Sequence, residues 1–506
     1  MLLLPCYSTV LVCYNPNYMA SLEELKNERL YKLKKVEEMG KVSFPAKISL
    51  VGTFATAKSV KESLVQGATP LATVLVAGRI MSKRGQGKIM FVDIADEFDT
   101  IQTVFKIDTL AEKEMNLFSE TVDLGDFIAV SGTPFITQRG EKSVEVKEWE
   151  LLTKAILPMP SVHFGLENEE EAMRKRYLDF ALDPKKRDLF YKKAKFWKVV
   201  REFLDEKGFL EVETPTLETT TGGAEAKPFK TYHNDFDMDV YMRICIGELW
   251  QKRLMASGFA KTYEIGRAYR NEGSSPEHLQ EFTNCEFYMA YADYQDGMKL
   301  VSLLYRKIAL EVFGTTKFEM KGHTFDLSDT WKEIDYADEI KSQTGIDIWE
   351  TSDENIKNKL EELGVKYDGD NRERLTDTLW KYCRKNISGP AFLVNHPLLV
   401  VPLAKPRTDG KTAQAFQPIF AGSEVGKGYS ELNDPRIQRA NFEKQQELLD
   451  AGDEEAMMPD YDFVEMLEHG MPPTCGFGFG DRLFAFLSGL PIREIQLFPL
   501  VKPKVE

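Results

Sequence analysis

Apolar and polar residues alternate on both sides of a polar break in the middle of the chain. Ser274, Ser275 and Pro276 form the break, so the pattern predicts a hairpin of two strands over residues 264–291. Successive strand side chains point to opposite faces. One face of the second strand carries the polar set Phe282, Asn284, Glu286 and Tyr288, and the other carries Thr283, Cys285, Phe287 and Met289. We expect the second set in a core and the first at a ligand; a solvated hairpin with scattered charges is the alternative.

Shorter alternating runs fill the N-terminal third of the chain. Five of them, separated by turns, predict strands at residues 71–83, 88–96, 100–107, 127–137 and 142–152, with a helical segment at 110–118. Five strands with one helix suit an OB-fold β-barrel, although other small barrels give the same pattern. Before them, Ser21 and Glu24 predict the capping box of a helix that ends near Gly40.

The rest of the chain predicts a larger domain that mixes helices and strands. A long helix is expected at residues 188–207, and the weak signals over residues 319–390 are interpreted as a helical insertion. The predicted organisation is an N-terminal extension at 1–20, a helical arm at 21–66, the barrel at 67–157, a linker at 158–182 and the larger domain at 183–506. The fold class is therefore α+β.

Composition narrows the possible partners and location. The 506 residues are 43% hydrophobic and 29% charged, which is typical of a soluble globular protein. A net charge of -15 argues against a protein that coats DNA or RNA, so any RNA contact must use local basic patches. The six cysteines form no CxxC pair, which indicates a reducing cytoplasm. The apolar start lacks a basic segment and contains Pro5 and Pro16, so we expect neither a signal peptide nor a membrane span.

Three stretches resemble the signature motifs of one family. RAYRNEG with the strand EFTNCEFYMAYADY resembles motif 2 of the class II aminoacyl-tRNA synthetases, and within them the lysine enzymes of subclass IIb. GFLEVETPTL, which contains Pro215, resembles motif 1, and EHGMPPTCGFGFGDRLFAFL resembles motif 3. The resemblance implies that an antiparallel catalytic sheet flanked by helices follows the OB-fold barrel, and that motif 1 forms a homodimer.

The resemblance also implies a nucleotide site. Arg270 and Arg482 are the expected catalytic residues, since a guanidinium binds two oxygens together. Glu272 would bind the adenine amino group and Phe282 would stack on the ring. The full set expected to bind ATP is Arg270, Glu272, His278, Phe282, Glu424 and Arg482. Glu424 and Gln417 are the expected Mg²⁺ ligands, although Gln417 stands where the family usually has a glutamate.

A second implied set binds the amino acid. Glu431 is expected at the ε-ammonium, because a long cation needs a desolvated anion at the deep end of its pocket. Glu248 and Glu286 would face the α-amino group. The lysine-binding set is Gly223, Glu248, Arg270, Glu286, Tyr288, Lys427, Tyr429 and Glu431. The sequence departs from the family pattern at three places: Ile246 and Gly247 replace one proline, Lys427 replaces an asparagine, and one residue is missing before Asp481. A solvent-exposed side chain is the alternative for Lys427.

The barrel segment resembles the anticodon-binding domain of the same enzymes. The match rests on AGRIMSKRGQGK, the strand with Phe91, and Gln102 eleven residues later. Phe91 would stack on a splayed base and Gln102 would read a uridine edge. Arg84 and Glu148 complete the anticodon-binding set. For Phe91 a place in the barrel core is the alternative.

The resemblance implies a ligase that uses ATP and Mg²⁺ to attach L-lysine to tRNA-Lys. One alternative is a paralogue that lysylates a protein, but such relatives lack the barrel. The other is a non-catalytic RNA-binding protein built on the same domain. Such proteins tend to lose the arginines of motifs 2 and 3, and this chain has both.

Overall fold

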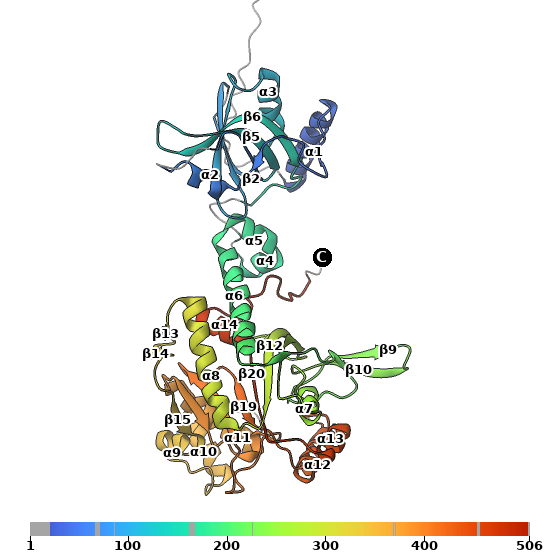
Figure 1. The fold of residues 1–506 in the computed structure, drawn as a ribbon, viewed down its shortest axis with the longest axis vertical. Helices are drawn as coiled ribbons and strands as arrows, with labels where there is room; N and C mark the ends of the chain where they lie inside the picture. The colour runs from blue at the N-terminus through green and yellow to red at the C-terminus, as the bar shows by residue number, and fades with distance from the viewer. Residues whose placement is uncertain are drawn as a thin grey trace, which may run out of the picture. The chain divides into compact units, whose positions relative to one another are not determined.

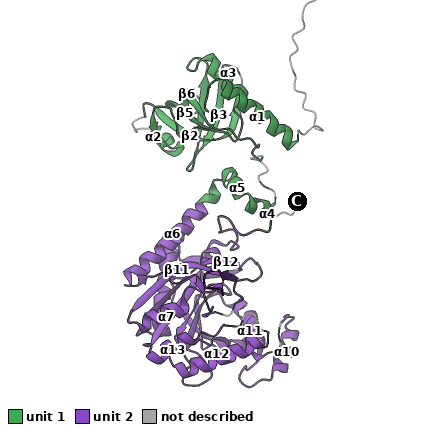
Figure 2. Cartoon of the chain, turned by 90° about the vertical axis from the view of Figure 1, so that its right-hand side faces the viewer, with its two compact units in different colours: residues 1–187, 501–506 green, residues 188–500 purple. Residues whose placement is uncertain are grey.

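The computed structural model describes residues 21–65, 71–85, 87–160, 166, 168–224, 226–367, 369, 371–452 and 456–503. The predicted N-terminal extension, residues 1–20, lies outside these ranges. The chain forms two compact units, one of residues 1–187 with 501–506 and one of residues 188–500 (Figure 2). None of the helices in the described ranges has the length and apolar character needed to cross a membrane.

The first unit is a β-barrel. Its strand order is β1-β2-β3-β4-β6-β5, and β2 also pairs with β5, which closes the sheet (Figure 1). The strands are β1 (Thr53–Phe54), β2 (Val74–Arg84), β3 (Ile89–Ala95), β4 (Thr100–Lys106), β5 (Phe127–Ile136) and β6 (Lys142–Thr153). Met90, Val92 and Ile94 of β3 are buried in its core, with the residues between them on the outer face. The alternating pattern and the OB-fold barrel predicted from it are confirmed.

Three helices accompany the barrel strands, and two short ones follow them. The first three are α1 (Leu22–Glu38), α2 (Ala57–Ser63) and α3 (Glu112–Thr121), and the predicted capping box of Ser21 and Glu24 begins α1. Part of the predicted linker forms two short helices, α4 (Glu169–Arg174) and α5 (Arg176–Leu182). Six or seven residues contain too few turns for a helical period to stand out in the sequence.

The second unit is organised around a nine-stranded, mainly antiparallel sheet. Its order is β15-β16-β17-β19-β20-β12-β11-β7, with β18 beside β17. The strands are β7 (Leu210–Glu211), β11 (Lys261–Tyr269), β12 (Glu281–Ala290), β15 (Lys332–Asp335), β16 (Ala391–Val394), β17 (Ala415–Phe420), β18 (Ser423–Glu424), β19 (Lys427–Ser430) and β20 (Thr474–Gly480). The predicted hairpin is confirmed as β11 and β12, with Glu264 opposite Glu286.

Long helices cover the apolar face of this sheet. Phe203 of α6 (Lys185–Glu206) and Val301 of α8 (Tyr294–Ile308) share one core cluster with Phe287 of β12 and Phe477 of β20. The π-helix at Ala309–Phe313 continues α8, and α14 (Asp481–Ser488) follows β20. The opposite face of the central strands therefore remains for polar residues.

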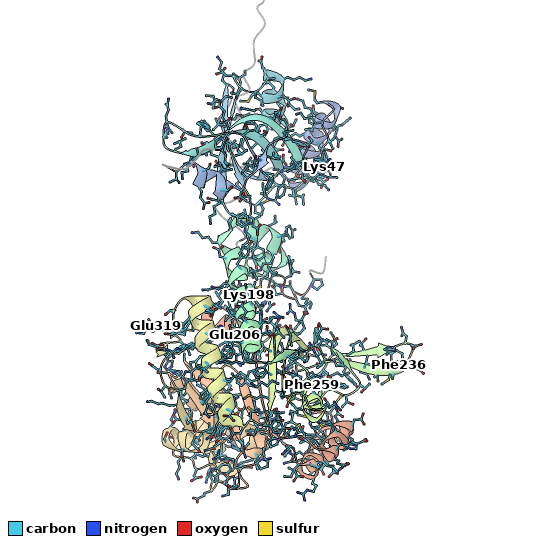
Figure 3. All side chains as sticks on the ribbon, in the orientation of Figure 1. Lys47, Lys198, Glu206, Phe236, Phe259 and Glu319 are labelled. Carbon is cyan, nitrogen blue, oxygen red and sulfur yellow. The ribbon has the colours of Figure 1, made fainter. Side chains whose placement is uncertain are left out.

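A smaller group of helices packs near that polar face. They are α7 (Glu248–Ala256), α12 (Pro435–Asp450) and α13 (Tyr461–His469), and Leu249, Phe442 and Phe463 share a core with Tyr288 of β12. Near α7, the strands β8 (Leu217–Glu218), β9 (Lys230–His233) and β10 (Met238–Met242) form a small sheet. Phe236 lies at the turn between β9 and β10 (Figure 3).

The predicted insertion is only partly helical. Its helices are α9 (Tyr336–Thr344), α10 (Asp353–Glu362) and α11 (Arg372–Cys383), with short 3₁₀ turns at Arg384–Asn386 and Leu398–Val400. Its first residues are instead the strands β13 (Lys317–Met320), β14 (His323–Asp326) and β15, so the helical prediction is wrong for residues 319–335. Four-residue strands are too short to give an alternating signal.

Candidate active site

Three neighbouring strands form the floor of the polar face. Tyr429 of β19, Gly476 of β20 and Tyr288 of β12 lie side by side in register, and Lys427, Gly478 and Glu286 form the next row. The glycines lie in the middle strand, so the space above them is left free for the side chains of β12 and β19. The alternating glycines of the sequence thus provide a cleft floor.

Gly476 is the tightest point of this floor. A Cβ atom at Gly476 would lie 2.3 Å from Oε1 of Glu431 and 2.4 Å from Cε1 of Tyr288. Neither atom belongs to a side chain that can easily move, because both residues are buried. The position therefore requires glycine for steric reasons.

Three buried carboxylates converge above the floor. Glu431 is 2% exposed, and Glu248 and Glu286 are each 6% exposed. Tyr429 donates a hydrogen bond from its hydroxyl to Oε1 of Glu248 at 2.5 Å, and Tyr288 donates one to Oε2 of Glu286 at 3.0 Å. The structure thus brings together five predicted lysine-binding residues that come from three separate parts of the chain.

Burial and mutual repulsion perturb these carboxylates. Burial raises the pKa of Glu431 to about 8, against the effect of the neighbouring Lys252 ammonium. Burial and then the charge of Glu248 raise the pKa of Glu286 to about 7. Carboxylic acids with such values release their protons most readily when a cation enters beside them. The cluster is therefore poised to bind a positively charged group.

Lys252 is the member of the cluster that our reading of the sequence missed. Its Nζ lies 2.7 Å from Oε1 of Glu248 and 2.5 Å from Oε2 of Glu431. Burial lowers the pKa of Lys252, but the two carboxylates outweigh burial and raise it above its usual value. The signal was present, because residues four apart share a helix face and Lys252 follows Glu248 by four.

Two glycines explain the backbone around Glu248. Gly223 has a φ of +92°, and a Cβ there would lie 2.7 Å from Sγ of Cys245 and 2.9 Å from Cβ of Glu248. Gly247 precedes α7 with a φ of +64°, and a Cβ there would lie 2.2 Å from Oγ1 of Thr214. A left-handed glycine thus starts the helix where the family usually has proline. Glu248 nevertheless points into the cluster.

The predicted nucleotide residues lie around the motif 2 hairpin. The Arg270 guanidinium lies 5.4 Å from the centre of the Phe282 ring, and its Nε donates to the carbonyl oxygen of Ile244. Glu272 follows Arg270 and is half-buried, and its backbone carbonyl accepts a hydrogen bond from Gln280. Arg270 and Phe282 are therefore brought together as predicted.

His278 and Arg482, two other residues of the predicted ATP-binding set, already have hydrogen-bond partners. His278 is exposed, its Nδ1 lies 2.8 Å from Oγ of Ser275, and burial and then Arg482 lower its pKa. Arg482 donates from Nη2 to Oε2 of Glu277 at 2.5 Å. Glu277 also pairs with Lys321 at 3.1 Å. The half-exposed Glu277, which our reading of the sequence did not single out, thus holds two cations.

The predicted Mg²⁺ ligands are engaged by the insertion and by a histidine. Glu424 accepts a hydrogen bond from Trp380 at 2.5 Å and pairs with Arg384 at 3.1 Å. Gln417 lies 2.7 Å from Nε2 of His396, whose pKa burial lowers to about 4. Glu424 lies opposite Ile419, two residues from Gln417, so the two oxygen donors share a face of the sheet. Carboxylate and amide oxygens fit a hard cation such as Mg²⁺.

Lys427 lies outside the buried cluster. Its side chain is exposed, and its Nζ is 3.5 Å from the carbonyl oxygen of Val400, at the outer limit for a hydrogen bond. The structure therefore places it at the rim, as in the solvent-exposed alternative.

The predicted anticodon residues lie on the outer face of the barrel. Phe91 pairs with Arg84 across β2 and β3, and it is half-buried and outside the barrel core, so the core alternative is wrong. Asp93 accepts a hydrogen bond from Arg84 at 3.0 Å and lies opposite Gln102. Glu148 lies opposite Ser131, well along β6 from the residue that pairs with Gln102. Arg84, Phe91 and Gln102 form one surface, which Glu148 does not join.

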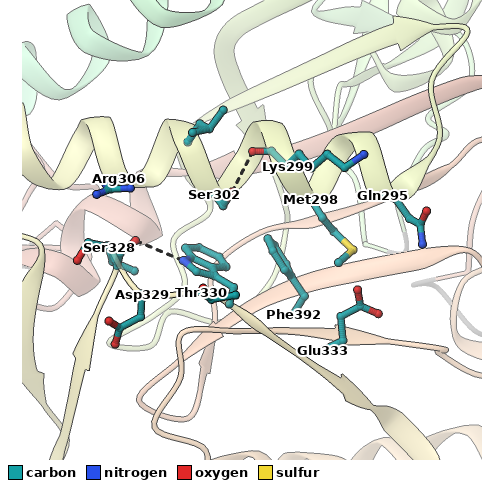
Figure 4. A pocket seen from close by; sticks show the side chains of 13 residues that line it. Gln295, Met298, Lys299, Ser302, Arg306, Ser328, Asp329, Thr330, Glu333 and Phe392 are labelled. Atoms are coloured by element: carbon teal, nitrogen blue, oxygen red, sulfur yellow. Dashed lines mark hydrogen bonds between the residues drawn. The ribbon is translucent and has the colours of Figure 1, made fainter.

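A separate pocket lies against α8. Phe392 lies beside Met298, and Lys299, Arg306, Asp329 and Glu333 place charges at the edges of the pocket (Figure 4). Trp331 also lines the pocket. Its volume is about 430 Å³, and it shares no residue with the carboxylate cluster. This pocket is therefore separate from the candidate active site.

Comparison with known proteins agrees with both units. Residues 168–502 match the family of class II tRNA synthetases (D, K and N), and residues 74–152 match the OB-fold nucleic acid binding domain. The protein is thus a class II tRNA synthetase with an OB-fold domain before its catalytic domain.

Relatives that match nearly the whole chain identify the family within this class. The lysine–tRNA ligase of Thermotoga maritima is 41% identical over 96% of this chain and 97% of its own, and that of Halalkalibacterium halodurans is 40% identical over 96% and 98%. The lysine–tRNA ligase of Shouchella clausii is 43% identical over 85% of this chain and 86% of its own. The chain belongs to the lysine–tRNA ligase family.

Gly476→Ala tests the steric argument for the cleft floor. The added methyl must displace Glu431 or Tyr288, so we expect the KM for lysine in ATP–pyrophosphate exchange to rise at least about tenfold, the cost of roughly 1.4 kcal/mol. Gly478→Ala is the matched comparison, because its Cβ would lie 3.2 Å from Cγ of Glu286, a contact that small shifts relieve. Equal effects of the two substitutions would contradict the assignment of Gly476 as the tight point.

Proposed function

We propose that this protein activates L-lysine with ATP to lysyl-adenylate and transfers the lysyl group to the 3′ end of tRNA-Lys. The observation that carries the proposal is the charge of the buried cluster. Glu248, Glu286 and Glu431 supply three negative charges when ionised, and Lys252 supplies one positive charge. The remaining two negative charges match the two ammonium groups of free lysine.

Each end of lysine has its own set of partners in this pocket. Glu431 receives the ε-ammonium, and its Oε2 accepts no well-aligned hydrogen bond from a described residue although Lys252 lies beside it. Tyr288 lies beside Gly476 and supports the same end. Glu248 and Glu286 receive the α-ammonium, with the backbone of Gly223 close to Glu248. Arg270 binds the carboxylate, and Tyr429 orients Glu248 through its hydrogen bond.

Activation is a phosphoryl-type transfer that depends on position and charge. The lysine carboxylate attacks the α-phosphorus of ATP in line, the bond to the β-phosphate oxygen breaks, and pyrophosphate leaves. Arg270 stabilises the charge at the α-phosphate, and Arg482 that at the leaving phosphates. Phe282 stacks on the adenine and Glu272 accepts from its amino group, while His278 lies beside Arg482 at the edge of the site. No side chain acts as a nucleophile.

Mg²⁺ neutralises phosphate charge when it is bound with ATP. Glu424 would hold it as a carboxylate ligand, with Gln417 as a weaker neutral donor on the same face. Arg384 and Trp380 contact Glu424, so a metal held by Glu424 would share this carboxylate with them or displace them.

The two alternative functions fit the chain less well. Residues 74–152 form an OB-fold barrel, which the relatives that lysylate proteins lack. Non-catalytic relatives tend to lose the arginines of motifs 2 and 3. Both arginines are present here, and Arg270 lies against Phe282. The outer barrel face with Arg84, Phe91 and Gln102 suits a single-stranded anticodon, with Phe91 as the stacking ring and Gln102 as the donor and acceptor.

We also propose that the protein is a cytoplasmic homodimer. Four described cysteines are free and buried, which suits a reducing compartment. Tyr191 of α6 is 53% exposed, and Leu497 and Phe498 near the end of the unit are 50% and 70% exposed. Phe190 and Trp197 of α6 line a groove with the same C-terminal segment. Exposed apolar residues around one helix favour an interface between two copies.

Glu431→Gln tests the lysine assignment. Removing one charge of a buried ion pair costs roughly 3–5 kcal/mol, so lysine-dependent ATP–pyrophosphate exchange should fall at least about a hundredfold. Glu468→Gln, at an exposed residue paired with Arg439, should retain exchange. Normal exchange in the Glu431 variant would remove the specificity argument, and circular dichroism of both variants checks their folding.

Phe91→Ala tests the anticodon face. Loss of a stacking platform costs roughly 1–3 kcal/mol per base, so aminoacylation of tRNA-Lys should show a KM for tRNA raised about five- to a hundredfold while ATP–pyrophosphate exchange stays unchanged. The control is Phe98→Ala, since Phe98 is 58% exposed in the same unit but not part of the face. If aminoacylation and ATP–pyrophosphate exchange fall to the same extent, Phe91 has a structural role instead.

Analytical ultracentrifugation tests the dimer. The intact protein should sediment with twice the mass of the chain, and Phe498→Asp should shift it toward the monomer because it buries a charge at the interface. Phe54→Asp changes an equally exposed ring in the first unit and should leave the dimer intact. A monomeric protein at micromolar concentration would refute the proposal.

A further inference from the structure

Lys252 has no step in the mechanism above, yet it occupies the centre of the amino-acid site. It is 1% exposed, and its ammonium bridges Glu248 and Glu431. In the proposed function these two carboxylates bind different ends of the substrate. One fixed cation therefore contacts both substrate anchors at once.

Lys252 has little freedom to leave this position. Glu248 lies one turn earlier on α7, so the pair is held on one helix face. Gln251, the next residue on the helix, is fully buried and donates to the carbonyl oxygen of Ile246, while Thr262 of β11 donates to its side chain. The ammonium also lies 5.5 Å from the Tyr429 ring centre and 5.9 Å from that of Phe463. The helix and its surroundings thus fix the lysine as a permanent part of the pocket.

The charge around Glu431 explains what a permanent cation does. The titratable groups that interact with Glu431 come from four elements: Glu248 and Lys252 of α7, Glu286 and Tyr288 of β12, Tyr429 of β19 and Cys475 of β20. Lys252 is the sole cation among these groups. Without it, three carboxylates would share the cavity with no fixed positive charge beside them, and ionising Glu431 would cost more free energy.

We propose that Lys252 is a built-in counter-ion, a positioning residue that offsets carboxylate charge in the cavity and holds Glu248 and Glu431 turned toward one ammonium, so that the pocket accepts an amino acid with two ammonium groups. The inference rests on the proposed function, because it takes these carboxylates as lysine ligands. It adds that specificity for a dication is set by the net charge of four side chains, one of them a lysine of the protein.

The test compares three variants of the full-length protein in ATP–pyrophosphate exchange from pH 6 to 9. Lys252→Met removes the charge and keeps the length, Lys252→Arg keeps the charge, and Arg253→Met removes the next cation on α7, which pairs with Asp460 at 2.9 Å. We expect Lys252→Met to raise the KM for lysine at least about tenfold and to change the KM for ATP less than about twofold. Arg253→Met should change neither.

The pH profile separates positioning from simple packing. Lysine binding requires ionised Glu431, so kcat/KM for lysine rises as pH increases toward the pKa of about 8. Loss of Lys252 raises that pKa further, which moves the rise in Lys252→Met to higher pH, whereas Lys252→Arg keeps the wild-type midpoint. The lysine-induced increase in Tm at pH 7 and 9 gives the same comparison without turnover.

Two results overturn the inference. One is a Lys252→Met protein with the wild-type lysine KM and pH midpoint; the other is an equal fall in kcat at every pH with both KM values unchanged. A wild-type protein that does not activate lysine would instead refute the proposed function, so the two failures are distinguishable. If Lys252→Met does not fold, a shifted midpoint in Lys252→Arg would overturn the inference as well.

Discussion

The buried cluster of three carboxylates and one ammonium is the constraint on which the catalytic unit depends. Ionised groups are costly away from water, and they are tolerated there only when opposite charges and hydrogen bonds surround them. The surroundings meet this requirement through Tyr288, Tyr429 and the backbone of Ile246. Gly476 leaves room for Glu431, and Gly247 starts α7 at the point that directs Glu248 inward. Residues that are distant in sequence thus stabilise the same buried cluster of charges.

Sequence alone was sufficient where structure depends on neighbours along the chain. The alternation in β12 assigns Cys285 and Phe287 to the core and Glu286 and Tyr288 to the cleft, and the structure places them so. The capping box at Ser21 is local in the same sense. The barrel strands can also be predicted from the sequence, since their inward-facing residues recur at every second position. Resemblance to a family then identified which polar residues face the ligand.

Other features depend on contacts between distant segments and left no periodic signal. Lys252 meets Glu431 only because α7 packs over the end of β19, about 180 residues further along the chain. Trp380 and Arg384 reach Glu424 from an insertion whose sequence carries no motif. Strand β15 forms because the distant β16 pairs with it, whereas β13 and β14 pair with each other. Short segments of this kind are decided by tertiary pairing and not by their own pattern.

The two halves of the site hold their charges differently, and this difference matches their tasks. Arg482 pairs with Glu277 and Arg384 with Glu424 in half-exposed positions, where an ion pair contributes roughly 0–1 kcal/mol. A triphosphate with its metal can replace such partners at little cost. Glu248, Glu431 and Lys252 are buried, where loss of one charge costs roughly 3–5 kcal/mol. The ion pairs at the nucleotide site can therefore be replaced by ATP and its metal. Discrimination between amino acids depends on the buried cluster, whose ion pairs form before the substrate binds.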